Sequence, residues 1–261
     1  MTTTASADLR GTSTFREDPW LSGIFGRKVF ELVLSSEEMI DFSQRELEEM
    51  SEESSAFCFA RVATDRLSVV RLLTGSGFNV VDVNITLERK PSPFTDSSPA
   101  RGLEVRDVEA DDAEALLSIA GTSFTYSRFH VDPLVPNSIA NEVKRAWIES
   151  YLERRRGERL LVCEREGVVA GFLAVLRTSS DGAAVRVIDL VGVARAHQGF
   201  GIGTALVESF IGDSYGVCDL LRVSTQVGNV PSMRLYERSG FRMAKTAYVL
   251  HAHIAAGQVR K

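Results

Sequence analysis

A run of alternating glycines carries the strongest chemical signal in the sequence. Gly199, Gly201 and Gly203 follow a hydrophobic segment that ends at Val193, and an apolar helical pattern begins within the glycines. Glycines leave backbone N–H groups open to a ligand, and the N-terminus of a helix is the positive end of its dipole. The spacing therefore predicts a loop that binds a pyrophosphate; the alternative is a glycine-rich helix start without a ligand.

Two common pyrophosphate-binding loops do not fit this run. A dinucleotide-binding loop needs a third glycine where Thr204 stands, and an acid where the next predicted strand ends in Thr225 and Gln226. A Walker loop needs Gly-Lys-Ser/Thr, which does not occur here. The pattern that fits is Gln/Arg-x-x-Gly-x-Gly/Ala, with Gln198 as its first residue.

This pattern resembles the coenzyme-binding motif of the GNAT N-acetyltransferases. A second segment, NVPSMRLYERSGF from Asn229 to Phe241, looks like that family's Asn-x-x-Ala-x-x-x-Tyr-x-x-x-Gly-Phe. The resemblance covers about residues 185–250. It implies a GNAT fold, acetyl-CoA as cosubstrate, and direct attack of an amine on the thioester in a ternary complex.

The resemblance also implies roles for individual residues. Tyr236 matches the general acid that protonates the departing thiolate, whose conjugate thiol has a pKa of about 8.5; packing at a helix–sheet corner is the alternative. Asn229 contacts the coenzyme or caps the helix that contains Tyr236. The residues expected to bind acetyl-CoA are Val191, Val193, Gln198, Gly199, Phe200, Gly201, Ile202, Gly203 and Asn229.

Asp189 is the candidate general base, because several relatives carry an acid at this position. Strand alternation predicts that Asp189, Val191 and Val193 lie on one face. Two alternatives stay open: an interstrand ion pair of Asp189 with Arg186 or Arg177, and loss of the amine proton to bulk water.

The acceptor is expected to bind at an aromatic segment, SFTYSRFHVD, over residues 123–132. With LRVSTQVGN and KTAYVLH it is similar to acetyltransferases that act on dTDP-4-amino-4,6-dideoxygalactose, which implies a nucleotide-activated amino sugar as acceptor. The candidate acceptor-binding residues are Phe124, Tyr126, Arg128 and His130. A protein N-terminus, a polyamine or an aminoglycoside are alternative acceptors, and a non-catalytic acetyl-CoA-binding module is the remaining alternative. His251 and His253 are expected at the surface.

The elements that position these residues follow the order β-α-α-β-β-β-α-β-α-β from Leu103 onward, which predicts an α/β or α+β domain with one mixed sheet over residues 103–254. A smaller α+β domain is expected over residues 14–89, after a disordered tail at 1–13. An acidic helix is expected over 37–53, and the Pro- and Ser-rich segment 90–102 is the predicted linker.

Residues 71–87 and 234–250 repeat one pattern, a helix, a Ser-Gly-Phe corner and a strand. The repeat suggests that the first domain is a degenerate GNAT-like half, with chance similarity as the alternative. The composition, 44% hydrophobic with a net charge of −5 over 261 residues, argues against a broadly basic nucleic-acid surface.

No apolar run reaches the roughly 20 residues of a membrane span, no signal peptide is visible, and the three cysteines are too scattered for a metal site. These features predict a cytoplasmic protein without a metal. Whether it is a homodimer stays open.

Overall fold

The computed structural model describes residues 14–34, 55–93, 102–255 and 258–260. The expected tail at 1–13, the expected helix over 37–53 and most of the expected linker lie outside the described residues. The chain forms two compact units, one of Met1–Val81 with Ala247–Lys261 and one of Asp82–Thr246. The boundary between the units falls within two strands, β4 (Asn79–Arg89) and β10 (Arg242–Ala255), and not in the segment 90–102 that was expected as the linker.

The first unit contains a sheet with the strand order β1-β2-β3-β10. Strands β2 and β3 are parallel, and the other neighbours are antiparallel. The elements of this unit besides β4 and β10 are β1 (Thr14–Glu17), α1 (Pro19–Phe25), β2 (Lys28–Val33), β3 (Ala56–Ala63), α3 (Leu67–Gly75) and β11 (Gln258–Arg260), which pairs with β10. Val69 and Leu73 of α3 pack with Cys58, Ala60 and Leu250 of the sheet in one hydrophobic cluster.

The second unit contains a mixed sheet with the strand order β4-β9-β8-β7-β6-β5, in which only β8 and β9 are parallel among the described pairs. Its elements are β5 (Leu103–Asp107), a 3-10 turn (Ala110–Asp112), α4 (Ala113–Thr122), α5 (Asn137–Leu152), β6 (Arg159–Arg165), β7 (Val168–Ser180), β8 (Ala183–Val193), a 3-10 turn (Arg195–His197), α6 (Ile202–Asp213), β9 (Leu220–Gln226) and α7 (Val230–Arg238). The predicted element order and the mixed sheet are confirmed.

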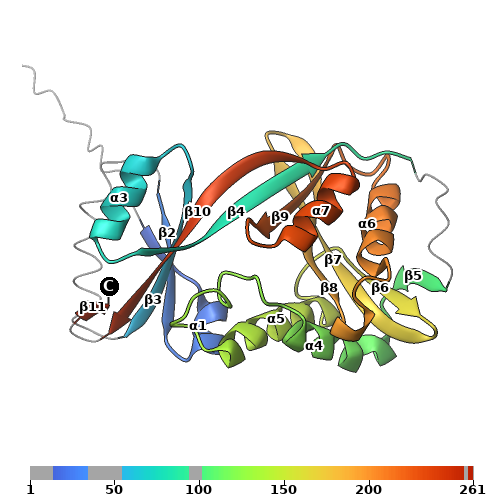
Figure 1. Cartoon of the computed structure of the whole chain (residues 1–261), viewed down its shortest axis with the longest axis horizontal. Helices are drawn as coiled ribbons and strands as arrows, with labels where there is room; N and C mark the ends of the chain where they lie inside the picture. The colour runs from blue at the N-terminus through green and yellow to red at the C-terminus, as the bar shows by residue number, and fades with distance from the viewer. Residues whose placement is uncertain (1–13, 35–54, 94–101, 256–257, 261) are drawn as a thin grey trace, which may run out of the picture. The chain divides into compact units, whose positions relative to one another are not determined.

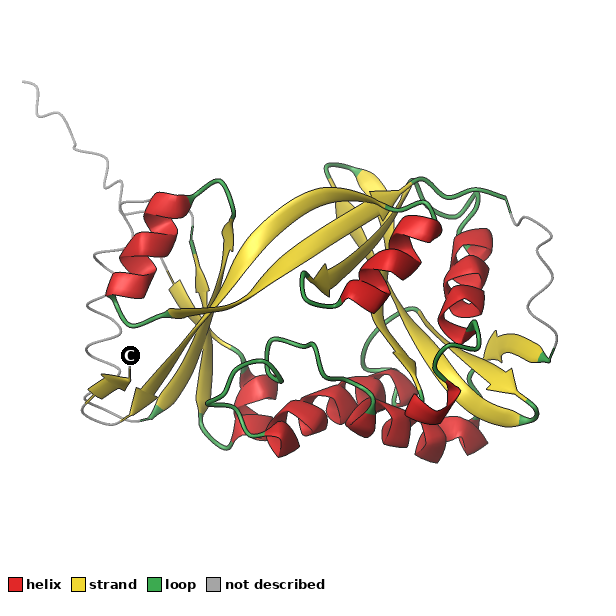
Figure 2. Ribbon diagram, viewed as in Figure 1, coloured by secondary structure: helices red, strands yellow, loops and turns green. Residues whose placement is uncertain are grey.

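Helices cover both faces of this second sheet (Figure 1, Figure 2). On one face α6 and α7 close a cluster that includes Leu173, Phe210 and Phe241. On the other face α4 and α5 pack against Phe172 and Leu190. Successive side chains of β7 and β8 therefore enter different cores, which explains the nearly continuous apolar sequence of these strands.

The repeated Ser-Gly-Phe corners have the same backbone geometry. Phe78 N–H donates to the Leu73 carbonyl at 3.0 Å, and Phe241 N–H donates to the Tyr236 carbonyl at 2.9 Å. The preceding glycines both have positive φ, +97° at Gly77 and +81° at Gly240. The likeness of residues 71–87 and 234–250 thus extends from sequence to local structure.

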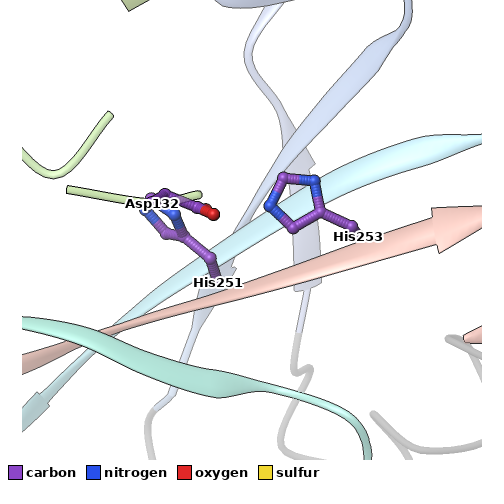
Figure 3. Close-up of side chains that lie close together, drawn as sticks. All are labelled: Asp132, His251 and His253. Carbon is purple, nitrogen blue, oxygen red and sulfur yellow. The ribbon is translucent and has the colours of Figure 1, made fainter. Parts of the chain in front are cut away.

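His251 and His253 are buried, so the expectation that they lie at the surface is wrong. They project from the same face of β10 (Figure 3), which pairs with β3. The Phe57 ring packs against both imidazoles, and Arg27 hydrogen-bonds to Nδ1 of His253 at 3.0 Å. Asp132, also labelled there, belongs to the second unit, where its carboxylate accepts from Leu134 N–H at 2.9 Å.

None of the helices in the described part of the chain is long and apolar enough to cross a membrane.

Candidate active site

The C-terminal end of β8 has one open edge. β8 and β9 pair only from Val185 to Ile188 on the β8 side, whereas β8 continues to Val193. On its other side β8 stays paired with β7 as far as Val193. The two parallel strands therefore separate after Ile188 and leave backbone groups of β8 without a neighbouring strand.

The pairing shows which backbone groups face this opening. Ala194 N–H donates to the Ala170 carbonyl at 2.9 Å, so Ala194 and, by alternation, Gly192 direct their N–H groups toward β7. The N–H groups of Val191 and Val193 consequently point to the open side. Val191 and Val193 are two of the residues that the family resemblance predicts to bind acetyl-CoA.

The glycine loop leads from this strand into α6. Gly199 and Gly201 both have φ +84°, a left-handed conformation that favours glycine. No side chain caps the start of α6, so its first N–H groups remain available to an anion. The Arg165 guanidinium lies 3.6 Å from the centroid of the Phe200 ring and adds a positive charge at this loop.

Three other residues of the loop contact the strand and the helices beside it. The Gln198 side chain donates to the Val193 carbonyl at 3.4 Å, which links the loop to the strand. Ile202 is buried in the core on the α6 side of the sheet. A Cβ added at Gly203 would lie 3.3 Å from Leu235 of α7, so glycine allows the two helices to approach closely.

Tyr236 lies in α7, in the same hydrophobic cluster as Val191 and Val193. Its side chain is buried and packs edge-on against Phe241, with ring centroids 5.9 Å apart. Burial raises the pKa of its hydroxyl, so the phenol stays protonated at neutral pH. Asn229 caps α7, because its side-chain oxygen accepts from Ser232 N–H at 3.3 Å. The cap is the alternative left open by the sequence; a coenzyme contact of Asn229 stays a prediction.

Residues 122–241 match the model of the acetyltransferase (GNAT) family. This segment contains the open strand edge, the glycine loop and Tyr236. The chain carries a GNAT-family acetyltransferase domain. Acetyl-CoA is the cosubstrate of such enzymes, and a strand edge beside an anion-binding helix start suits its extended arm and its pyrophosphate.

Three known proteins are similar over most of this acetyltransferase. The spore coat polysaccharide biosynthesis protein SpsD of Bacillus subtilis is 25% identical over 248 residues, which cover 93% of this chain and 84% of SpsD. A dTDP-fucosamine acetyltransferase of Escherichia coli O6:H1 is 23% identical and covers 74% and 80%. A tandem GNAT protein from the clavulanic acid biosynthesis pathway has a similar fold, with TM-score 0.58, 15% identity and coverage of 88% and 76%.

A β-bulge turns Asp189 of the acetyltransferase to the opposite face from Val191. Val175 pairs with Ile188 and Ala174 pairs with Leu190, so Asp189 is an extra residue in β8. Its carboxylate contacts α5, whereas Val191 and Val193 pack on the α6 side. The predicted alternation of these three residues is wrong, because the extra residue breaks the two-residue period of the strand.

The Asp189 carboxylate accepts four hydrogen bonds. Arg156 donates to both oxygens, at 2.7 and 3.0 Å, Trp147 donates from its indole at 2.9 Å, and Tyr151 donates from its hydroxyl at 2.7 Å. Burial alone would raise the pKa of Asp189, but the bonds and charge of Arg156 and the Trp147 bond lower it below the ordinary value. The interstrand ion pair of Asp189 with Arg186 or Arg177 is therefore wrong: Asp189 pairs with Arg156, which follows α5, and Arg186 pairs with Glu158.

The four candidate acceptor-binding residues lie between α4 and α5 in different environments. Tyr126 is exposed, and the Arg128 guanidinium lies 4.4 Å from the centroid of the Phe129 ring. His130 hydrogen-bonds to the Ser127 hydroxyl through Nδ1 at 2.6 Å and to Asn141 Oδ1 through Nε2 at 2.9 Å. Burial and the charge of Lys144 lower the pKa of His130.

Phe124 connects this region to the open strand. A Cβ added at Gly192 would lie 2.8 Å from the Phe172 ring and 3.3 Å from the Phe124 ring, so glycine is required for the aromatic contact with β8. On its other side the Phe124 centroid is 5.1 Å from Nζ of Lys144.

Lys144 of α5 lies beside Phe124 and Trp147, and no expectation from the sequence included it. It is buried in α5, where Val143, Trp147, Ile148 and Tyr151 form the apolar stripe, and it stands three residues before Trp147 on that stripe. A lysine on the apolar face of a helix is the signal that could have identified it.

Proposed function

We propose that the acetyltransferase transfers the acetyl group of acetyl-CoA to the amine of a nucleotide-activated amino sugar, of the dTDP-4-amino-4,6-dideoxyhexose type, in the cytoplasm. The observation that carries the transfer chemistry is the open edge of β8 at Val191 and Val193, adjacent to the glycine loop. Support for the sugar comes from the names of the two relatives, one a polysaccharide biosynthesis protein and the other a dTDP-fucosamine acetyltransferase.

In this mechanism the amine attacks the thioester carbon directly. The N–C bond forms and the C–S bond breaks through a tetrahedral intermediate, whose oxyanion accepts hydrogen bonds from the β8 backbone. The thiolate that leaves takes a proton from Tyr236, the nitrogen loses its proton to water, and the Tyr236 phenolate regains a proton from water. The Tyr236 hydroxyl has no hydrogen-bond partner in the described part of the chain and is available for this transfer.

We assign Asp189 to positioning rather than to proton abstraction. A carboxylate that accepts four hydrogen bonds and has a lowered pKa is a weak base. Its hydrogen bonds hold Trp147 and Tyr151 of α5 against β8. In this proposal they thereby orient the α5 side chains beside which the acceptor binds.

The test is acetyl-CoA turnover, measured as release of free thiol, with dTDP-4-amino-4,6-dideoxygalactose beside a polyamine and a peptide panel. Saturable turnover with the sugar nucleotide alone supports the proposal. Turnover only with a polyamine, an aminoglycoside or a peptide retains the acetyltransferase and refutes the sugar. Binding of acetyl-CoA without turnover of any amine indicates a non-catalytic module.

A further inference from the structure

Lys144 is a buried cation that forms no ion pair with the described residues. Its residue is 8% exposed, yet no hydrogen bond or ion pair joins its ammonium to another residue in the described part of the chain. The ammonium lies beside two aromatic rings, with Nζ 5.1 Å from the Phe124 centroid and 4.9 Å from the Trp147 centroid. Ring faces attract a cation but leave its three N–H donors unused.

The charges around Lys144 do not neutralise it. Arg128 and Asp189 are the charged groups that act on its pKa, Arg128 by lowering it and Asp189 by raising it. The Asp189 carboxylate is already paired with Arg156. Burial is the main cause that lowers the pKa of Lys144, to about 8, so the side chain is still mostly protonated at neutral pH.

Lys144 also lies near the part of β8 where we propose that the acetyl group is transferred. Phe124 packs beside Lys144 and occupies the space that a Cβ at Gly192 would need, and Trp147 contacts both Lys144 and Asp189. These contacts come from α5 and the segment after α4, on the face of the sheet opposite α6. An acceptor that reaches the thioester from this face meets the ammonium.

We propose that the Lys144 ammonium, held between Phe124 and Trp147, binds an anionic group of the acceptor, such as a diphosphate oxygen, and thereby selects anionic over cationic acceptors. An anion supplies the negative charge and the hydrogen-bond acceptors that the Lys144 ammonium lacks among the described residues. A polyamine would instead place a second positive charge beside the ammonium. The inference rests on the proposed transfer reaction and specifies the charge of its acceptor.

The experiment compares the full-length wild type with Lys144→Met, which keeps the length of the side chain and removes the charge. Two acceptors are used at saturating acetyl-CoA, dTDP-4-amino-4,6-dideoxygalactose and the neutral methyl glycoside of the same amino sugar. We expect Lys144→Met to raise KM for the dTDP sugar by about 10- to 100-fold, with little change for the methyl glycoside or for acetyl-CoA. Arg145→Met, a neighbouring exposed residue of α5, is the control and should leave all three values unchanged.

An equal change in KM for the dTDP sugar and the methyl glycoside, or no change in KM for the dTDP sugar, overturns the inference. Either result leaves the proposed function intact. If the dTDP sugar is not acetylated at all, the proposed function fails. Wild type and Lys144→Met are then compared by a binding measurement instead. Inorganic pyrophosphate is titrated by calorimetry into protein saturated with CoA, which blocks the glycine loop. Pyrophosphate binding that is about 10- to 100-fold weaker to Lys144→Met than to wild type supports the anion site. Equal binding to both proteins overturns it.

Lys144→Arg provides a second variant in case Lys144→Met does not fold. It keeps a cation over the two rings, so the preference for the anionic over the neutral acceptor should persist. Loss of that preference in a folded Lys144→Arg, with both acceptors equally affected, contradicts charge recognition.

Discussion

Arg156 donates to both carboxylate oxygens of Asp189, from Nε at 2.7 Å and from Nη2 at 3.0 Å. The pair joins the segment after α5 to the bulged residue of β8, and Trp147 and Tyr151 complete the set of donors. Asp189, which was expected to be the general base, is therefore a carboxylate whose hydrogen bonds connect α5 to β8.

Asp189→Asn should mainly lower the free energy of unfolding and should have a smaller effect on kcat. We expect a loss of about 2 kcal/mol in the free energy of unfolding, because the buried carboxylate loses its charge and part of its hydrogen bonding, while half-exposed Arg156 stays solvated. Urea unfolding measures the loss. Asp107→Asn is the control, since Asp107 pairs with Arg159 at the surface and should cost less than about 1 kcal/mol.

The same pair makes stability depend on pH in the acid range. The pKa of Asp189 is lower in the folded than in the unfolded state, so its stabilisation is present above the unfolded value of about 3.9 and is lost as pH falls through the folded value. The difference in stability between wild type and Asp189→Asn should shrink over that range. A reduction in kcat of Asp189→Asn by more than about 100-fold, with a missing basic group in the pH profile, would restore Asp189 as the base.

Tyr236→Phe should lower kcat by about 10- to 100-fold without weakening acetyl-CoA binding. The phenol ring stays packed against Phe241, and only the hydroxyl that protonates the thiolate is removed. Burial raises the pKa of Tyr236, so no loss of activity from its ionisation is expected below about pH 10. Thiol release and calorimetric binding check both values, with exposed Tyr215→Phe as the control. Full turnover by Tyr236→Phe would exclude the residue from the mechanism.

Gly201→Ala should weaken acetyl-CoA binding, because alanine at φ +84° is strained and the loop relaxes away from the geometry that presents its N–H groups. The expected cost in stability is about 1 kcal/mol. Gly182→Ala is a matched control, since Gly182 has φ +81° and open space around it, in the turn between β7 and β8. Both variants should lose similar stability. If both also bind acetyl-CoA equally well, the glycine loop does not hold the coenzyme.

His130 should be neutral at pH 7 with its proton on Nε2, because Asn141 Oδ1 accepts there and the Ser127 hydroxyl donates to Nδ1. Burial and Lys144 lower its pKa, so stability is retained above the unfolded value of about 6.5 and falls as pH drops below it. NMR of the ring nitrogens reports both the tautomer and the titration. Lys144→Met should raise the pKa of His130 by removing a like charge, and a titration unchanged in that variant would refute the coupling.

The sequence by itself determined the local features of this protein. The glycine spacing from Gln198 to Gly203, the motif from Asn229 to Tyr236 and the element order after Leu103 depend on backbone conformation and helix capping, which neighbouring residues control. For the same reason both Ser-Gly-Phe corners repeat one hydrogen-bond pattern.

Only the tertiary structure decided which side chains share an environment. A single bulge reversed the direction of Asp189, because the extra residue shifts the two-residue period of β8, and the mismatch with β7 is invisible in either strand alone. Lys144 became a buried cation because the helix face that carries it packs against β8. Likewise, pairing of β10 with β3 buried His251 and His253. These outcomes depend on contacts between residues far apart in the chain, which local sequence does not specify.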